Sequence, residues 1–142
     1  MSAMEAAWSE HAAAQLTAAG HRRGGAREAV IELLDSQPCA LTALEIEDAL
    51  RAGRRVGRAS VYRVLDELET LGLVSRVDVG DGIARYEPHR GHHHHLVCDG
   101  CGRLEPFQDD ALEQAIRRLA DRVSFDVSDH DVTLHGCCER CR

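Results

Sequence analysis

Residues 91–102 of this 142-residue sequence read Gly-His-His-His-His-Leu-Val-Cys-Asp-Gly-Cys-Gly. This segment holds six candidate metal ligands, four histidines and two cysteines. If the histidines lie in an extended strand, successive side chains point to opposite faces. His92 and His94 then share one face, and His93 and His95 share the other. One strand would therefore supply imidazoles to two separate metal sites, while the cysteines after it contribute to a third.

Two Cys-x-x-Cys pairs predict that the third site holds structural zinc. Four thiolates form the tetrahedral set that zinc prefers, here Cys98, Cys101, Cys138 and Cys141. No signal peptide is visible, so we expect a cytoplasmic protein, whose reducing surroundings favour zinc over disulfides. The histidines have two alternative interpretations, an expression tag or a solvated turn that binds metal adventitiously. The second cysteine pair argues against both.

Composition and charge indicate which classes of protein this sequence fits. The net charge is −7 and 44% of the residues are hydrophobic, which fits one ordinary domain or two small ones. No segment approaches the roughly 18 apolar residues of a membrane span. The acidic balance argues mildly against nucleic-acid binding. The distribution of charge argues for it, because one stretch without acidic residues holds five arginines: Arg51, Arg54, Arg55, Arg58 and Arg63.

Helical spacing of apolar residues predicts several helices in residues 1–72. One helix occupies 1–19, and a second surrounds Ala29–Leu34. Thr42 and Glu45 form a capping box that begins a third.

The last of these helices is the candidate for DNA recognition. Ser60 would cap its start, and Gly72 would end it. Residues 73–79 and 83–87 are then predicted to form a hairpin. Helices followed by a hairpin are typical of a winged helix-turn-helix domain, here residues 1–87, in which the N-terminal end of this helix faces the major groove. A generic helical core is the alternative that periodicity alone leaves open.

Residues 88–91 form a short hinge, and residues 92–142 are predicted to form a small α/β domain, so the fold class is α+β. Strands are expected at the histidines, at 104–107 and around Val132. The acidic pair at 109–110 favours the start of a helix. We expect the apolar stripe of this helix to be buried: Leu112, Ala115, Ile116, Leu119, Ala120 and Val123.

Spacing alone does not assign partners to the histidines, and the candidates are Glu87, Glu105, Glu113, His130 and His135. The sequence contains no glycine-rich phosphate loop and no convincing pair of nucleophile and base. We therefore expect no enzymatic activity. A zinc hydrolase that uses the histidines as ligands is the enzymatic alternative.

Three motifs together resemble one known family. They are Gly-Arg-Ala-Ser-Val-Tyr-Arg-Val-Leu at 57–65, the histidine and cysteine segment at 92–102, and Gly-Cys-Cys-Glu-Arg-Cys at 136–141. With these motifs the chain resembles the ferric uptake regulator family of metal-dependent repressors over nearly its whole length. The resemblance implies a homodimer that binds a double-stranded DNA operator, with N-terminal winged-helix domains and a C-terminal dimerisation domain.

The resemblance also implies which residues form each metal site. A regulatory hinge site, for zinc or iron(II), would use Glu87, His93 and His95. A second site, in the dimerisation domain, would use His92, His94, Glu113 and His130.

The DNA contacts implied by the resemblance lie mainly on the recognition helix. Tyr62 would contact a base and Arg63 a phosphate, while Arg22 would enter the minor groove. Arg58 and Ser60, at the start of the helix, complete the predicted DNA-binding set.

Departures from the family pattern leave the regulatory metal open. The loop that usually supplies a hinge histidine contains Cys39 here, so Cys39 is a candidate ligand, and Glu105 is another. His94 stands where zinc-responsive members commonly have histidine, whereas Glu87 in place of a cysteine favours another metal. We expect a zinc-sensing repressor of metal-uptake genes, similar to the zinc uptake regulators. The alternatives are an iron- or peroxide-responsive repressor and, from another class, a metal storage or delivery protein.

Overall fold

The computed structural model describes residues 3–22, 24–37, 39–53 and 56–142, and divides the chain into two compact units, Met1–Arg90 and Gly91–Arg142. Arg54 and Arg55, two of the arginines singled out in the sequence, lie outside the described residues. Within the described part, no helix has the length and apolar character needed to cross a membrane.

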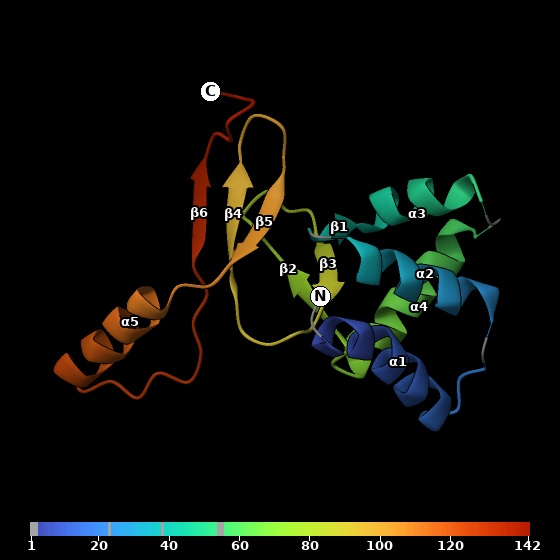
Figure 1. The fold of residues 1–142 in the computed structure, drawn as a ribbon, viewed down its shortest axis with the longest axis horizontal. Coiled ribbons are helices and arrows are strands. Elements are labelled where there is room, and N and C mark those ends of the chain that lie inside the picture. Colours follow the sequence, from blue (N-terminus) through green and yellow to red (C-terminus); the bar gives the residue numbers. More distant parts are fainter. Residues whose placement is uncertain (1–2, 23, 38, 54–55) are drawn as a thin grey trace. The chain divides into compact units, whose positions relative to one another are not determined.

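Four helices form most of the first unit (Figure 1): α1 Ala3–Ala18, α2 Gly25–Ser36, α3 Ala43–Arg51 and α4 Arg58–Thr70. The predicted capping box of α3 is confirmed, because the Glu45 N–H donates to Thr42 Oγ1 at 3.0 Å and the Thr42 N–H donates to Glu45 Oε1 at 2.9 Å. The predicted start of α4 was wrong. The helix begins two residues before Ser60, and its N-cap is Gly57, which has no side chain to cap it.

Three short strands complete the first unit: β1 Leu41–Thr42, β2 Val74–Val77 and β3 Arg85–Pro88, in the antiparallel order β1-β3-β2. The hairpin strands are shorter than predicted. β2 ends at Val77 and β3 begins at Arg85, so the connection between them is longer than the three residues between the predicted strands. Within this connection Gly80 and Gly82 have φ values of +93° and +76°, which suit a turn. The two-residue β1 was not predicted, because so short a strand leaves no alternating pattern.

The core of the first unit gathers the apolar stripes of its helices. The helix α4 contributes four buried residues to it: Val61, Val64, Leu65 and Leu68. Trp8 on α1 is 5% exposed, and its indole N–H donates to the carbonyl of Leu73 at 2.9 Å. An ion pair ties α2 to α4, since Arg27 donates to both carboxylate oxygens of Glu67 at 2.8 Å.

A three-stranded sheet organises the second unit, with strands β4 His94–Cys98, β5 Leu104–Phe107 and β6 Thr133–Gly136 in the order β5-β4-β6. The central strand β4 pairs antiparallel with β5 and parallel with β6. The helix α5 Asp110–Arg122 lies between β5 and β6 in the sequence, and Asp109 caps it by accepting from the Leu112 N–H at 3.0 Å.

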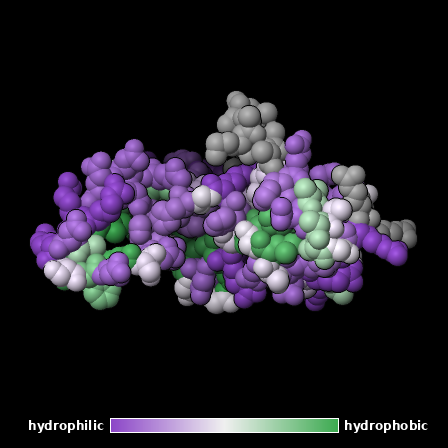
Figure 2. Space-filling view, turned by 90° about the horizontal axis from the view of Figure 1, so that it is seen from below, coloured by the Kyte–Doolittle hydropathy of each residue, from purple (hydrophilic) through white to green (hydrophobic). Residues whose placement is uncertain are grey.

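The predicted burial of the α5 stripe was wrong for a single chain. No residue of α5 is buried, and Leu119 is 48% exposed. After the helix, Val123 and Phe125 are 56% and 69% exposed. Hydrophobic surface is visible at the left end of Figure 2, the end at which Figure 1 draws α5. The stripe has helical spacing, but the described residues of its own unit leave it partly or largely exposed.

Trp8→Ala should lower the free energy of unfolding of the helical unit by about 3–5 kcal/mol, because it removes a buried aromatic side chain and the bond to Leu73. His11→Ala, an exposed change on the same helix, should stay within about 0.5 kcal/mol of the wild type. Urea unfolding followed by circular dichroism measures both. Equal stability of the two variants would contradict the placement of Trp8 in the core.

Candidate metal centres

The four histidines divide between the two faces of the extended segment, as the sequence predicted. The ring centroids of His92 and His94 are 4.6 Å apart on one face. Those of His93 and His95 are 4.9 Å apart on the other. Each pair is close enough for both rings to serve one ion.

The two cysteine pairs meet because of how the strands end. A turn follows β4 and brings the Cys98 N–H to the carbonyl of Arg103 at 2.9 Å. Parallel pairing sets Gly136, the last residue of β6, beside Cys98. The four sulfur atoms then lie within 4.8 Å of one another: Cys98, Cys101, Cys138 and Cys141. This is the compact thiol set that zinc requires.

Gly100 permits this approach. A Cβ atom at this position would lie 2.9 Å from Cβ and 3.0 Å from Sγ of Cys141. Any side chain here would push Cys141 away from the other sulfurs. Sequence reasoning missed this role, although a glycine inside a Cys-x-x-Cys turn is a visible signal.

The sulfur cluster already favours negative charge at one position and opposes it at another. N–H groups of Cys138 and Cys101 lower the pKa of the Cys98 thiol to about 6, the former donating at 3.3 Å. Hydrogen bonds of Cys141 to the sulfurs of Cys138, Cys98 and Cys101 raise its pKa to about 12. Full ionisation therefore needs a cation, and thiolates suit a borderline-soft ion such as zinc.

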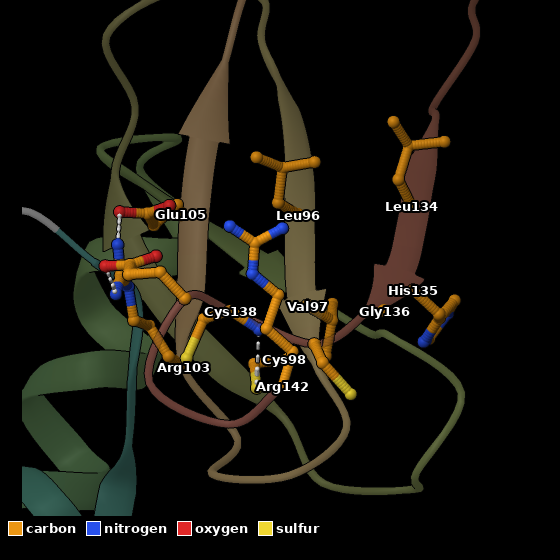
Figure 3. Close-up of a pocket in the computed structure, with 12 residues that line it drawn as sticks. Leu96, Val97, Cys98, Arg103, Glu105, Leu134, His135, Gly136, Cys138 and Arg142 are labelled. Carbon is orange, nitrogen blue, oxygen red and sulfur yellow. Dashed lines mark hydrogen bonds and ion pairs between the residues drawn. The ribbon is translucent and has the colours of Figure 1, made fainter.

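A hollow of about 350 Å³ lies beside these cysteines (Figure 3), and Cys137 lines it without joining the four sulfurs. Arg103 lies at one side of this hollow in Figure 3 and forms ion pairs with Glu105 and with Glu139, the latter at 3.1 Å. These pairs fasten the C-terminal cysteine turn to β5. Glu105 also pairs with Leu96 across the sheet, on the face opposite His95. Its position gives no support to Glu105 as a partner of His95.

A second group of ligand atoms surrounds Glu113 on α5. Its Oε1 lies 2.6 Å from Nε2 of His94, and its Oε2 lies 2.7 Å from Nε2 of His130. His92 Nε2 is 3.2 Å from His130 Nε2, and all four ligand atoms lie within 4.8 Å of one another. Three imidazoles and one carboxylate can bind zinc or a similar divalent ion.

His94 is the most constrained member of this group. It is 1% exposed, and the Val132 N–H donates to its Nδ1 at 3.1 Å. The ring is therefore oriented with Nε2 toward Glu113. Burial opposes ionisation of Glu113, but hydrogen bonds from His94 and His130 outweigh it and hold the pKa of this carboxyl below its ordinary value. An ionised carboxylate is the form that binds a cation.

The predicted hinge residues come from both units. Glu87 lies on β3 opposite Ser75, and Cys39 precedes β1. His93 and His95 belong to the second unit. Their combination into one site stays a prediction.

The predicted DNA-binding residues lie on or near the exposed side of α4. Tyr62 is 52% exposed, and Arg58 and Arg63 are also exposed. Ser60 is half-buried in the first turn of the helix, and Arg22 is exposed before α2. The buried stripe of α4 faces the core, so Arg58, Tyr62 and Arg63 lie at the surface on the other side of the helix, where Arg58 forms an ion pair with Glu47.

Comparison with known proteins agrees with this arrangement. Residues 18–135 match the ferric uptake regulator family. The chain belongs to the ferric uptake regulator family. A ferric uptake regulation protein of Bacillus subtilis is 33% identical over 133 residues, covering 89% of each chain. The peroxide-responsive repressor PerR of Staphylococcus aureus is 32% identical over 135 residues, covering 94% of this chain and 90% of its own.

Solved structures agree as well. The ferric uptake regulator of Vibrio cholerae has a TM-score of 0.74 and 33% identity, and the match covers 87% of this chain and 97% of that one. The α+β fold is confirmed, and the protein is a metal-responsive, DNA-binding repressor and not an enzyme. Family membership and the donor sets above support structural zinc together with a regulatory metal.

Cys98→Ser should remove one zinc ion per chain and unfold the second unit, because structural zinc sites contribute about 10 kcal/mol or more of binding free energy. Cys137→Ser is the matched control, since this neighbouring thiol lies outside the four, and it should keep both zinc and fold. Elemental analysis and thermal unfolding test the pair. Full zinc content in Cys98→Ser would rule out the four-sulfur site.

Proposed function

We propose that this protein is a cytoplasmic zinc-sensing repressor of metal-uptake genes. Residues 1–87 would bind DNA, residues 88–91 would act as the hinge, and residues 92–142 would dimerise and hold metal. The observation that carries the proposal is the division of His92–His95, at and just before the start of β4, between two faces. Imidazole-rich donor sets fit zinc, and His94 adds a third imidazole to the group around Glu113.

Three sites have separate tasks in this proposal. The sulfurs of Cys98, Cys101, Cys138 and Cys141 hold structural zinc. The group of His92, His94, Glu113 and His130 holds a second ion within the dimerisation domain. Glu87, His93 and His95 form the regulatory site, with Cys39 as a candidate fourth ligand.

The regulatory site acts because its ligands come from different parts of the chain. Glu87 must approach His93 and His95 to share one ion, so metal binding favours the arrangement that brings them together. The linker has features suited to such a change. Arg90 is held to the first unit by Asp35 and lies over the Trp8 ring at 5.7 Å, whereas Gly91 adopts a φ of +102°. The solved Vibrio cholerae relative is described as showing rearrangement of its DNA-binding domains.

Recognition of the operator falls to α4. Tyr62 would contact a base, and Arg63 and Arg22 would contact the backbone and the minor groove. Such contacts position the protein in a salt-dependent manner, while a few base contacts give sequence preference.

The exposed stripe of α5 supports dimerisation of the second unit. Leu119 and Val123 are about half exposed in the single chain, and Phe125 is 69% exposed. Apolar surface of this kind is typical of a protein–protein interface. A homodimer would bury it and place two copies of α4 on one operator.

His93→Ala should abolish the gain in DNA affinity on adding zinc, because it removes one imidazole of the regulatory site. We expect that gain to be about 5- to 150-fold in the wild type, the usual range for coupling between sites. The probe is a duplex selected by the zinc-loaded wild type from a randomised pool, titrated by gel shift.

His135→Ala is the control for this experiment. His135 is an exposed imidazole paired with Asp99, outside the three groups. Its removal should leave the zinc response intact. If wild-type affinity is the same with and without added metal, the protein is not a metal-controlled repressor, and a storage or delivery role becomes the better explanation.

Leu119→Glu should convert the dimer to a monomer, because it introduces a charge into the apolar stripe of α5. Gln114→Glu adds the same charge to another exposed side of α5 and should leave the dimer intact. Sedimentation velocity at micromolar concentration distinguishes the two results. A dimeric Leu119→Glu protein would place the interface elsewhere.

Iron- and peroxide-responsive repression are the alternatives within the family, supported by the names of the Bacillus subtilis and Staphylococcus aureus relatives. Titration of the selected duplex with zinc, iron(II) and manganese(II) separates them. The proposal requires zinc to act at the lowest free concentration.

A further inference from the structure

Glu47, near the middle of α3, is an acidic side chain placed against two arginines. Its side chain is 12% exposed. Oε1 accepts from Nη2 of Arg51 at 3.2 Å, and Oε2 accepts from Nε of Arg58 at 3.0 Å. Arg51 is one turn further along α3, and Arg58 is the first residue of α4, so the carboxylate links the end of α3 to the start of α4.

The bond to Glu47 uses one particular nitrogen of Arg58. Nε is occupied, while Nη1 and Nη2 have no hydrogen bond to a residue that the structure describes. The Arg58 side chain is 66% exposed. The two terminal nitrogens, Nη1 and Nη2, are therefore available to a partner, while the bond from Nε to Glu47 fixes the orientation of the guanidinium. The hydrogen bond from Arg58 is the main reason that the pKa of Glu47 is lowered, so the carboxylate is ionised at neutral pH.

Two kinds of acceptor on DNA fit such a fork, a phosphate and the O6 and N7 atoms of guanine. The adjacent carboxylate distinguishes between them. A negative charge 3.0 Å from Nε offsets the positive charge of Arg58 and weakens its attraction to a phosphate. A hydrogen bond to a neutral base edge depends less on net charge and more on the direction of the donor N–H groups, which the Glu47 carboxylate fixes. Arg58 also occupies the N-terminal end of α4, from which recognition helices contact bases.

We propose that Glu47 is a positioning residue that holds Arg58 with its terminal nitrogens outward to recognise a guanine in the major groove. This inference rests on the proposed function, in which α4 enters that groove. Arg51, held by the other oxygen of Glu47, contributes positive charge at the same end of the domain.

The experiment uses the full-length, zinc-loaded protein and two probes. One is the duplex selected by the wild type from a randomised pool, together with its single-base variants. The other is a mixed-sequence duplex of the same length. The variants are Glu47→Gln, Arg58→Ala, Arg58→Lys and the combination of Glu47→Gln with Arg58→Ala. Asp48→Asn is the matched control, because it removes the same charge from α3. Asp48 forms an ion pair with Arg51, and its influence on Arg58 is coulombic and smaller than that of Glu47.

Glu47→Gln should reduce the preference for guanine at one position of each half-site about tenfold or more. It should also raise affinity for the mixed-sequence duplex and steepen the salt dependence, because the released Arg58 can then contact a phosphate. A role limited to stabilising the fold would not increase non-specific binding. Arg58→Ala should lose the same guanine preference, and the double variant should behave like Arg58→Ala. Asp48→Asn should keep the preference.

Arg58→Lys tests the fork without changing Glu47, since lysine keeps the charge but has no planar pair of donors. It should lose the guanine preference and retain non-specific affinity. The inference is overturned if guanine preference survives in Glu47→Gln or Arg58→Lys. It is equally overturned if Arg58→Ala weakens binding to all duplexes alike with a shallower salt slope, the behaviour of a phosphate contact. A wild type with no sequence preference would instead overturn the proposed function.

Discussion

Alternation along β4 and the two histidines that precede it is the constraint on which the second unit depends. Because side chains of a strand alternate, four consecutive histidines become two pairs, with His92 and His94 on one face and His93 and His95 on the other. The same strand ends at Cys98, where parallel pairing with β6 delivers the second cysteine pair. A shift of one residue in this strand would exchange the faces and separate the imidazoles from Glu113. The register of the central strand β4 thus determines which ligands of the second unit come together.

Much of this arrangement could be predicted because it follows from local rules. Alternation of the histidines, the capping box at Thr42 and the four-cysteine set all depend on spacing within short segments. The errors have equally physical causes. The start of α4 was misplaced because Ser60 looks like a cap, whereas the chain uses Gly57. The α5 stripe was predicted to be buried because spacing identifies an apolar face but not what covers it. The contacts of Glu113 and Glu47 depend on tertiary structure, which no spacing rule supplies.

Positive charge is concentrated near one end of α4, although the net charge of the chain is negative. A chain of net charge −7 presents arginines at one end of α4, and its acidic residues are partly used to orient them. Glu67 accepts hydrogen bonds from Nε and Nη2 of Arg27 between α2 and α4, and Glu47 accepts one from Nε of Arg58. In both cases a carboxylate with little exposure fixes a guanidinium, and the pKa of that carboxylate is lowered mainly by the hydrogen bond it receives. In such a pair the carboxylate weakens the long-range attraction of the arginine to a negative charge, but it fixes the direction in which the guanidinium points.

The indole of Trp8 has a consequence for how this molecule can be observed. It is the sole tryptophan of the chain, it is held in place by the Leu73 carbonyl, and the guanidinium of Arg90 lies 5.7 Å from its ring centre. A cation at that distance alters the energy of the excited indole, and Arg90 is the last residue before the boundary between the two units. The protein therefore carries an intrinsic fluorophore at the base of its linker, so that movement of this anchor changes the emission spectrum without any attached dye.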